Sequence, residues 1–264
     1  MKTIMLAQAS ISVLLIVISQ TSSLPSPGLP KLPLPQRSRI DTRILESMIN
    51  PNGTKLECTM TVEDEFKGRS GLIPIRYRWQ NFNVFIDPAY NSNERGLINN
   101  AMYRLSQVLP CVRFGIWQEG SRPSGDYVHI KKASGCSAAV GKQGGAQHMS
   151  LASPGCMSMG TMMHEMIHSL GFYHEQSRPD RDDFVIVRYQ NIQPGTEHNF
   201  NKYSSSQVST FGVAYDLRSI MHYGSTAFSK NGQPTIIARN GGAVGSTGDL
   251  RNSDIMKLKR MYNC

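Results

Sequence analysis

Three histidines and one glutamate stand close together near the middle of the chain, in a segment that reads H-E-M-I-H-S-L-G-F-Y-H and begins at His164. On a helix, His164 and His168 are four residues apart, so both imidazoles project from one face and can bind the same zinc ion. Gly171 can end that helix, and the backbone can then bring His174 back toward the metal. Three neutral histidines leave one coordination position open for water, which is typical of a catalytic zinc site.

Glu165 lies next to the first histidine and is not needed to hold the metal. Zinc lowers the pKa of a bound water to about 7, and a carboxylate within hydrogen-bond reach can take the proton as that water attacks a peptide carbonyl. The same carboxyl group can then protonate the leaving amine. The segment therefore predicts one zinc ion per chain and metal-assisted hydrolysis, with Glu165 as general base and general acid.

A second motif, S-I-M-H-Y-G, begins at Ser219. A methionine in a turn downstream of the long histidine motif is the metzincin pattern, and it predicts that the thioether of Met221 lies beneath the metal site. Together with H-E-M-I-H-S-L-G-F-Y-H-E-Q-S-R-P-D-R-D, the motif resembles the astacin family of secreted zinc endopeptidases. The similarity extends from about Ser70 to the last residue.

The resemblance assigns further roles at the site. In that family the tyrosine of the methionine turn is a labile zinc ligand that swings away to hydrogen-bond the tetrahedral intermediate, and Tyr223 matches it. From the residues alone, Tyr223 would be interpreted as a half-buried core tyrosine, and Met221 is structural in either case. The glutamate that matches Glu175 pairs in family members with the new N-terminal ammonium after activation. The alternative for Glu175 is a solvated carboxylate in a loop.

The N-terminal part of the chain has the composition of processed segments. Residues 1–23 carry Lys2, a short apolar run and small residues before position 24, which predicts a secretory signal peptide. Residues 24–69 begin with a proline-rich tract that cannot form a core, and we interpret them as a propeptide with one glycosylation sequon at Asn52. Cleavage after Arg69 would suit a trypsin-like activating protease and would leave 70–264 as the catalytic domain.

Cys58 lies about where family propeptides carry the aspartate that blocks the metal, and this sequence lacks that aspartate. A thiolate is a good zinc ligand, so one hypothesis is that Cys58 fills the open position in the zymogen. A stray thiol or an intermolecular crosslink is the alternative.

Four of the five cysteines remain in 70–264, an even number that fits disulfides in an oxidising compartment. Four cysteines allow three pairings, and the sequence alone does not choose among them. The family resemblance implies the pairs Cys111–Cys264 and Cys136–Cys156.

The elements around the motifs follow from residue patterns. Residues 83–86, 112–117 and 127–130 are rich in β-branched and aromatic side chains, which predicts strands. An amphipathic helix is expected over 93–108, and residues 144–151 are expected to form an edge strand to which an extended peptide could pair. Ser253 is expected to cap a last helix. The apolar stripes of the two helices are Leu97, Ala101, Leu105 and Val108 for the first, and Ile255, Leu258, Met261 and Tyr262 for the last.

We therefore predict an α+β, two-lobed, metzincin-type domain. Its N-terminal lobe holds a twisted sheet and the active-site helix, its C-terminal lobe is loop-rich, and a cleft runs between them. The function expected is that of a secreted zinc endopeptidase acting on protein or peptide substrates as a monomer. A catalytically silent binding module and a structural zinc domain are the alternatives, and the latter would be expected to close the fourth position with cysteine.

The net charge of +9 is spread along the chain rather than clustered; the most notable groups are the pair Lys131-Lys132 and, near the end, Lys257, Lys259 and Arg260. There is no nucleic-acid-binding motif and no apolar run long enough for an integral membrane segment. Residues 244–249, where some astacin-like enzymes select an acidic residue after the scissile bond, contain no basic side chain. We expect weak selectivity there. His129, His148, His198 and His222 lack ligand spacing and are interpreted as structural or surface residues.

Overall fold

The computed structural model describes residues 71–72, 74–117, 120–121, 123–207 and 209–264. The predicted signal peptide, the predicted propeptide, Cys58 and the sequon at Asn52 lie outside the described residues.

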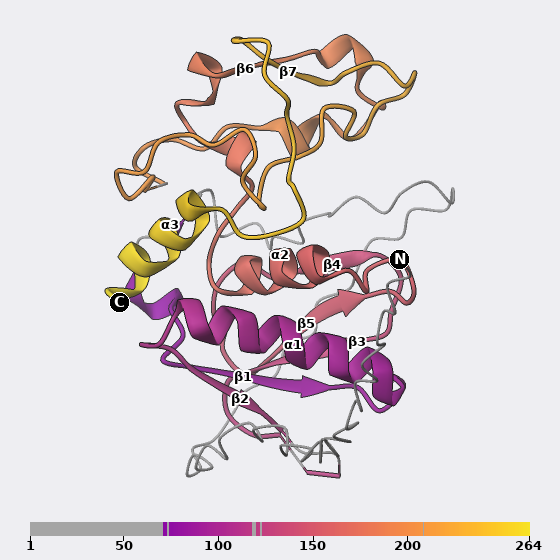
Figure 1. Ribbon diagram of the computed structural model, residues 1–264, viewed down its shortest axis with the longest axis vertical. Coiled ribbons are helices and arrows are strands. Elements are labelled where there is room, and N and C mark those ends of the chain that lie inside the picture. The colour runs from indigo at the N-terminus through magenta and orange to yellow at the C-terminus, as the bar shows by residue number, and fades with distance from the viewer. Residues whose placement is uncertain (1–70, 73, 118–119, 122, 208) are drawn as a thin grey trace, which may run out of the picture. The chain divides into compact units, whose positions relative to one another are not determined.

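A five-stranded sheet is the largest β element of the described part (Figure 1). Its strands run in the order β2-β1-β3-β5-β4; β1 is parallel to β2 and β3, β3 is parallel to β5, and β4 is antiparallel to β5. Alternate residues of β1, namely Phe82, Val84 and Ile86, are fully or almost fully buried, because successive side chains of a strand point to opposite faces. The strand bounds are Asn81–Ile86 (β1), Arg113–Ile116 (β2), Tyr127–Lys131 (β3), Cys136–Ala138 (β4) and Ala146–Leu151 (β5).

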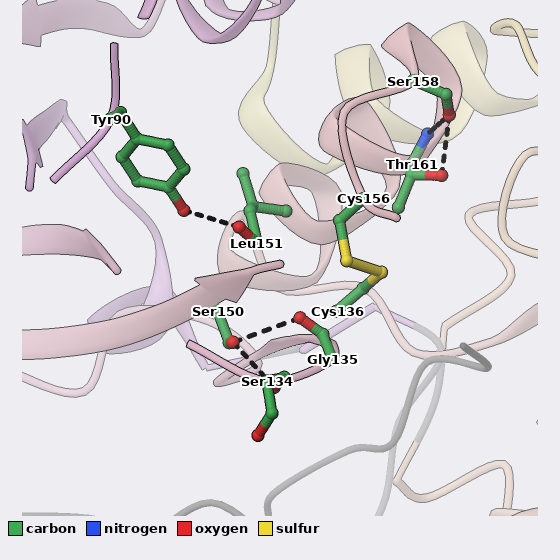
Figure 2. The surroundings of a disulfide bond; sticks show 9 residues. All are labelled: Tyr90, Ser134, Gly135, Cys136, Ser150, Leu151, Cys156, Ser158 and Thr161. Carbon is green, nitrogen blue, oxygen red and sulfur yellow. Dashed lines mark hydrogen bonds between the residues drawn. A yellow bond between two sulfur atoms is a disulfide. The ribbon is translucent and has the colours of Figure 1, made fainter. Parts of the chain in front are cut away.

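The expectation that 144–151 forms the sheet edge is wrong. This segment contains β5, which lies between β3 and β4, and β4 takes the edge position with the register Cys136 to Leu151 and Ala138 to Met149. The disulfide Cys136–Cys156 joins the start of β4 to the turn that follows β5, so β4 is held against β5 at that end (Figure 2). A three-residue strand carries too little pattern to be recognised from sequence, which is why β5 looked like the edge.

The first long helix, α1 (Ser92–Val108), begins at a capping box. The Asn91 side chain accepts from the Glu94 backbone N–H at 3.0 Å, and the Glu94 carboxylate accepts from the Asn91 N–H at 2.7 Å. Ala101, Leu105 and Val108 face the core as predicted, but Leu97 is 39% exposed. Ile98 takes its place on the buried face together with Met102.

Helix α2 (Met159–Ser169) packs against α1 and β4. Its N-cap is Ser158, whose hydroxyl oxygen accepts from the Thr161 N–H at 3.1 Å (Figure 2). The face of α2 turned to the core carries Met162, Met163, Met166 and Ile167, each at most 1% exposed. Eight of the eleven residues of the helix that holds the H-E-x-x-H segment are buried.

The last helix, α3 (Asn252–Tyr262), has Arg251 as its N-cap, so the prediction that Ser253 caps it is wrong. The Ser253 hydroxyl instead donates to Asp216 Oδ2 at 2.6 Å. Leu258 and Met261 reach the core as expected. No helix among the described residues combines the length and the apolar composition that crossing a bilayer requires.

Two separate groups of buried side chains form the described core. The first belongs to the sheet and to α1, α2 and α3, and it includes Met221. The second is smaller, lies around β6 (Val185–Val187) and β7 (Ile236–Ala238), and includes Tyr223. The rest of the segment between α2 and α3 is loop and short 3-10 helix, so the α+β class and the loop-rich C-terminal half agree with expectation. The 3-10 helices are Ile75–Tyr77, Glu175–Ser177, Arg181–Asp183, Tyr189–Asn191 and Glu197–Phe200.

Candidate metal centre and active site

His164, His168 and His174 converge on one point. The Nε2 atom of His174 lies 3.2 Å from Nε2 of His164 and 3.2 Å from Nε2 of His168. Nitrogens about 2.0–2.1 Å from a tetrahedral zinc ion would be separated by about 3.3 Å, so this spacing fits zinc. Of the described residues, this is the one group of three or more His, Cys, Asp or Glu side chains whose ligand atoms lie close enough to share a metal ion.

The protonation state of the three rings also fits a metal. Nδ1 of His164 donates to the Ile220 carbonyl at 2.7 Å, and Nδ1 of His168 donates to the Phe172 carbonyl at 2.6 Å. These bonds place the proton on Nδ1 and leave the Nε2 lone pair free to bind a metal. Burial lowers the pKa of all three histidines, in the case of His164 to about 4. The rings are therefore neutral near pH 7, which is the form that binds zinc.

Gly171 brings the third histidine to the other two. Its φ of +107° lies in the left-handed region that favours glycine, and the backbone leaves the helix there. The Gly171 N–H donates to the His168 carbonyl at 2.8 Å, and the Phe172 N–H donates to the Ile167 carbonyl at 3.1 Å. An added Cβ at position 171 would also come within 2.7 Å of Met261 Cε on α3.

The methionine turn lies against the histidines through its backbone. The Ile220 carbonyl accepts from the His164 ring, and the Met221 carbonyl accepts from the Glu175 N–H at 2.9 Å. The Met221 side chain is 3% exposed and packs in the first core, so its structural interpretation agrees with its position.

Tyr223 lies beside the third histidine, with its ring centroid 4.3 Å from that of His174. The Tyr223 ring is 5% exposed and packs against Phe200 and Phe228 in the second core. Its backbone N–H donates to Gln176 Oε1 at 3.1 Å. The tyrosine is thus a core residue beside the third histidine and is more deeply buried than a half-buried position, while its role toward the metal stays a prediction.

The two glutamates of the motif are both buried. Glu165 is 0% exposed within α2, next to His164. Glu175 is 2% exposed, so the alternative of a solvated loop carboxylate is wrong. The Glu175 carboxylate accepts from Lys257 Nζ at 2.6 Å, from Arg178 Nη1 at 3.1 Å and from the Asp216 N–H at 3.2 Å.

A small cavity lies beside Glu175, and the volume open to the centre of a water molecule is about 10 Å³. That is about the space one ordered water needs. Phe172 lines the cavity, and the first described residues run next to it, because Gly71 pairs with Phe172 and the Leu72 N–H donates to the Gly171 carbonyl at 3.0 Å. Ser70, the expected new N-terminus, lies outside the described residues.

Disulfides join Cys111 to Cys264 and Cys136 to Cys156, the pairing that the family resemblance implies. The remaining histidines are not among the three converging ligands: His129 and His148 lie on neighbouring strands of the sheet, His198 is exposed, and His222 is buried with its Nε2 accepting from the Tyr215 hydroxyl at 2.7 Å.

Sequence reasoning missed two residues near the site, Asp254 and Lys257. The sequence pattern showed Lys257 only as one of three basic residues near the end of the chain, yet it is 4% exposed, and Asp254 is 3% exposed. The available signal was their spacing of three on a helix, which puts both side chains on one face.

Comparison with known proteins identifies a family. The family model described as Astacin, a peptidase family, matches residues 73–263. Among curated proteins, zinc metalloproteinase nas-15 of Caenorhabditis elegans is 41% identical over 68% of this chain and 31% of its own length. Zinc metalloproteinase nas-7 of the same species is 40% identical over 74% of this chain and 51% of its own length. Meprin A subunit beta of Mus musculus is 37% identical over 76% of this chain and 28% of its own length. The chain thus spans between 28% and 51% of the length of these three relatives.

Solved structures agree in fold. High choriolytic enzyme 1, a hatching enzyme zinc-protease from the medaka fish Oryzias latipes, superposes with a TM-score of 0.64 at 31% identity and covers 72% of this chain and 96% of its own. Myroilysin shares the fold at a TM-score of 0.52 and 20% identity, over 72% of this chain and 97% of its own.

Proposed function

The chain belongs to the astacin family of peptidases, and on this premise we propose that it is a secreted zinc endopeptidase that hydrolyses peptide bonds in protein or peptide substrates. The observation that carries the proposal is the convergence of three neutral imidazoles, in which Nε2 of His174 lies 3.2 Å from Nε2 of each of the other two. The choice of zinc agrees with the relatives nas-15 and nas-7, which are named zinc metalloproteinases.

His164, His168 and His174 would hold the zinc ion through Nε2, with the Ile220 and Phe172 carbonyls orienting the first two rings. When bound, the ion supplies Lewis-acid chemistry that makes water nucleophilic near neutral pH. Glu165 would accept the proton of that water and pass it to the leaving amine. The Tyr223 hydroxyl would donate a hydrogen bond to the oxygen on which negative charge develops.

Latency and activation form a second part of the proposal. We assign residues 24–69 to the propeptide and propose that a protease removes it by cutting after Arg69. The new ammonium would then reach the cavity beside Glu175, which is supported by the position of Gly71 next to Phe172. Cys58 stays a candidate for the group that keeps the zymogen silent.

Substrate binding would use the sheet edge. Because β4 lies at the edge, its outer backbone groups are those to which an extended peptide could pair by strand addition. The segment 244–249 carries no basic side chain, so we expect weak selectivity for acidic residues after the scissile bond.

The test compares the activated wild type with Glu165→Gln on a pool of internally quenched peptides. Loss of a general base lowers kcat by about 10²- to 10⁴-fold, while zinc content should stay at one per chain because Glu165 is not a ligand. Glu197→Gln, which changes an exposed carboxylate that accepts from the Gly195 N–H, is the matched control and should cleave as the wild type does.

Two outcomes would contradict the proposal. Equal kcat for Glu165→Gln and wild type would remove Glu165 from its role. A correctly activated wild type that holds zinc and cleaves no peptide in the pool would favour a catalytically silent binding module instead.

A further inference from the structure

Helix α3 contacts the methionine turn through Asp254, in the first turn of the helix. The Asp254 carboxylate accepts from the Ser219 hydroxyl, from the Ile220 N–H at 3.0 Å and from the Arg251 N–H at 3.0 Å. The Ser219 oxygen in turn accepts from the Met221 N–H at 3.1 Å. One buried carboxylate thus fixes the first residues of the methionine turn.

The position of that turn decides where two of the three histidines lie. Its Ile220 carbonyl accepts the proton of His164 Nδ1 at 2.7 Å, and so orients the His164 ring. Its Met221 carbonyl accepts from the N–H of Glu175, the residue that follows His174, at 2.9 Å. A shift of the turn would therefore move the acceptor of the His164 ring and the acceptor of the Glu175 N–H, next to His174.

Lys257 makes a second connection, three residues further along α3. Its Nζ atom lies 2.6 Å from Glu175 Oε2 and 3.8 Å from Asp254 Oδ1. Arg178 contacts Glu175 from the other side at 3.1 Å. These four residues are each at most 4% exposed, and Arg178 also contacts Asp180 at 2.7 Å, so each buried charge has a partner of opposite sign, which buried charges require.

The helix that carries Asp254 and Lys257 is itself fixed at several points. Leu258 and Met261 pack in the first core, and Cys264 is joined to Cys111 directly after the helix ends. These contacts fix the position of α3 against the core, so the side chains of Asp254 and Lys257 are held in place.

We propose that Asp254 and Lys257 are positioning residues of the zinc site: Asp254 holds the methionine turn that orients His164, and Lys257 holds Glu175 next to His174. The hydrogen bonds of the two residues go to Ser219, Ile220, Arg251 and Glu175, and the three histidines are not among these partners. The inference rests on the proposed zinc site, and it adds that the affinity of the three histidines for zinc is set in part by the last helix of the chain.

The test measures zinc affinity of the activated protein by competition with a chromophoric chelator, using zinc alone as the probe. Asp254→Asn keeps the side-chain shape and removes the charge and one acceptor oxygen. Loss of a group that hydrogen-bonds a metal ligand typically weakens metal binding about 10- to 100-fold; Asp254 acts through Ile220, so we expect a loss at the lower end of this range, about tenfold. Lys257→Met should weaken zinc binding less, because Arg178 still contacts Glu175.

Glu94→Gln is the matched control. Glu94 is also a buried carboxylate three residues after the N-cap of a helix, and it accepts from a serine hydroxyl (Ser153), from the Asn91 N–H and from a lysine (Lys132). It lies in α1, away from the methionine turn. Glu94→Gln should lower the thermal midpoint of the metal-free protein while zinc affinity stays within about twofold of the wild type.

Substitution of zinc by Co²⁺ gives a second readout. The visible d–d bands of Co²⁺ report ligand geometry, and they should change in Asp254→Asn and stay as in the wild type in Glu94→Gln. If Asp254→Asn fails to fold, Ser219→Ala removes one contact of the same carboxylate and should weaken zinc binding in the same direction.

Unchanged zinc affinity in Asp254→Asn, or in Ser219→Ala where that variant replaces it, would overturn the inference. So would an equal loss of affinity in Glu94→Gln, because the effect would then be general destabilisation. Both results are independent of peptide hydrolysis, so they are distinguishable from failure of the proposed endopeptidase activity.

Discussion

Replacing Tyr223 with phenylalanine removes only the hydroxyl group from a ring whose centroid lies 4.3 Å from that of His174. The phenyl ring would still fill the space between Phe200 and Phe228, whose ring centroids lie 5.9 and 5.6 Å from that of Tyr223. Core packing is therefore kept, and the three histidines are untouched. Loss of one donor to a developing oxyanion typically costs about 10²–10³ in kcat, or about 2.7–4 kcal/mol of transition-state stabilisation. We expect a fall of that size with KM and zinc content unchanged.

The assay measures kcat and KM on an internally quenched peptide, together with zinc content by elemental analysis and the thermal midpoint. Tyr215→Phe is the control, because Tyr215 is also a buried tyrosine and its hydroxyl donates to His222 at 2.7 Å. Because this change leaves the buried Nε2 of His222 without its donor, it should cost about 1–3 kcal/mol of stability, with kcat within about twofold of the wild type. A kcat for Tyr223→Phe within about threefold of the wild type would refute the oxyanion role, and an equal loss in Tyr215→Phe would show that the effect is not local.

Two further predictions concern stability. The Cys111–Cys264 disulfide closes a loop of 153 residues and Cys136–Cys156 one of 20, so the loop-entropy model predicts losses of about 5 and about 3 kcal/mol for the two double alanine variants, measured by urea unfolding. A larger loss for Cys136→Ala/Cys156→Ala would contradict that order. Hydrogen bonds from Ser153, and then from Lys132, lower the pKa of Glu94 to about 2. A carboxyl group whose pKa is lower in the folded state stabilises the fold at pH values above its ordinary pKa, and this stabilisation is lost as the pH falls through the lowered pKa. The difference in unfolding free energy between wild type and Glu94→Gln should therefore be constant above about pH 5 and shrink toward pH 2. A gap that widens on acidification would show the opposite sign.

The metal site is the part of this protein that sequence predicts best, because its information is local. Residues four apart on a helix lie on the same face, so the spacing of His164 and His168 places both rings together. Gly171 adopts the left-handed backbone conformation after which the chain brings His174 to the other two histidines. The residue types limit the chemistry further, since three imidazoles and no thiolate point to zinc with an open position.

The errors concern contacts between segments that are distant in the chain. Residues 144–151 looked like a sheet edge, since nothing in their own pattern shows that Cys136–Ala138 pairs beside them. Ile98 displaces Leu97 from the buried face of α1, since the choice between two neighbouring apolar residues depends on the packing partner. Serine is a favourable N-cap residue, but the Ser253 hydroxyl donates a hydrogen bond to Asp216 instead. Each of these outcomes depends on a tertiary partner, which propensity does not contain.

Lys257 shows the same limit for charge. A lysine in a basic run near the end of a chain is normally solvated, and only the presence of Glu175 and Asp254 in the same interior region makes its burial favourable. The number of lysines was available from the sequence, but their distribution between surface and interior was not.

The burial of the Lys257–Glu175 pair bears on how the protein should respond to electrolytes. Mobile ions screen exposed pairs such as Arg251–Asp216, in which the side chains are 48% and 18% exposed, but they have little access to a pair at 5% and 3%. Raising sodium chloride should therefore weaken the outer charge contacts while the histidine cluster keeps its arrangement. The stability of the metal site at high salt would then depend on the burial of its ion pairs. The positive net charge of the chain would have little influence on it.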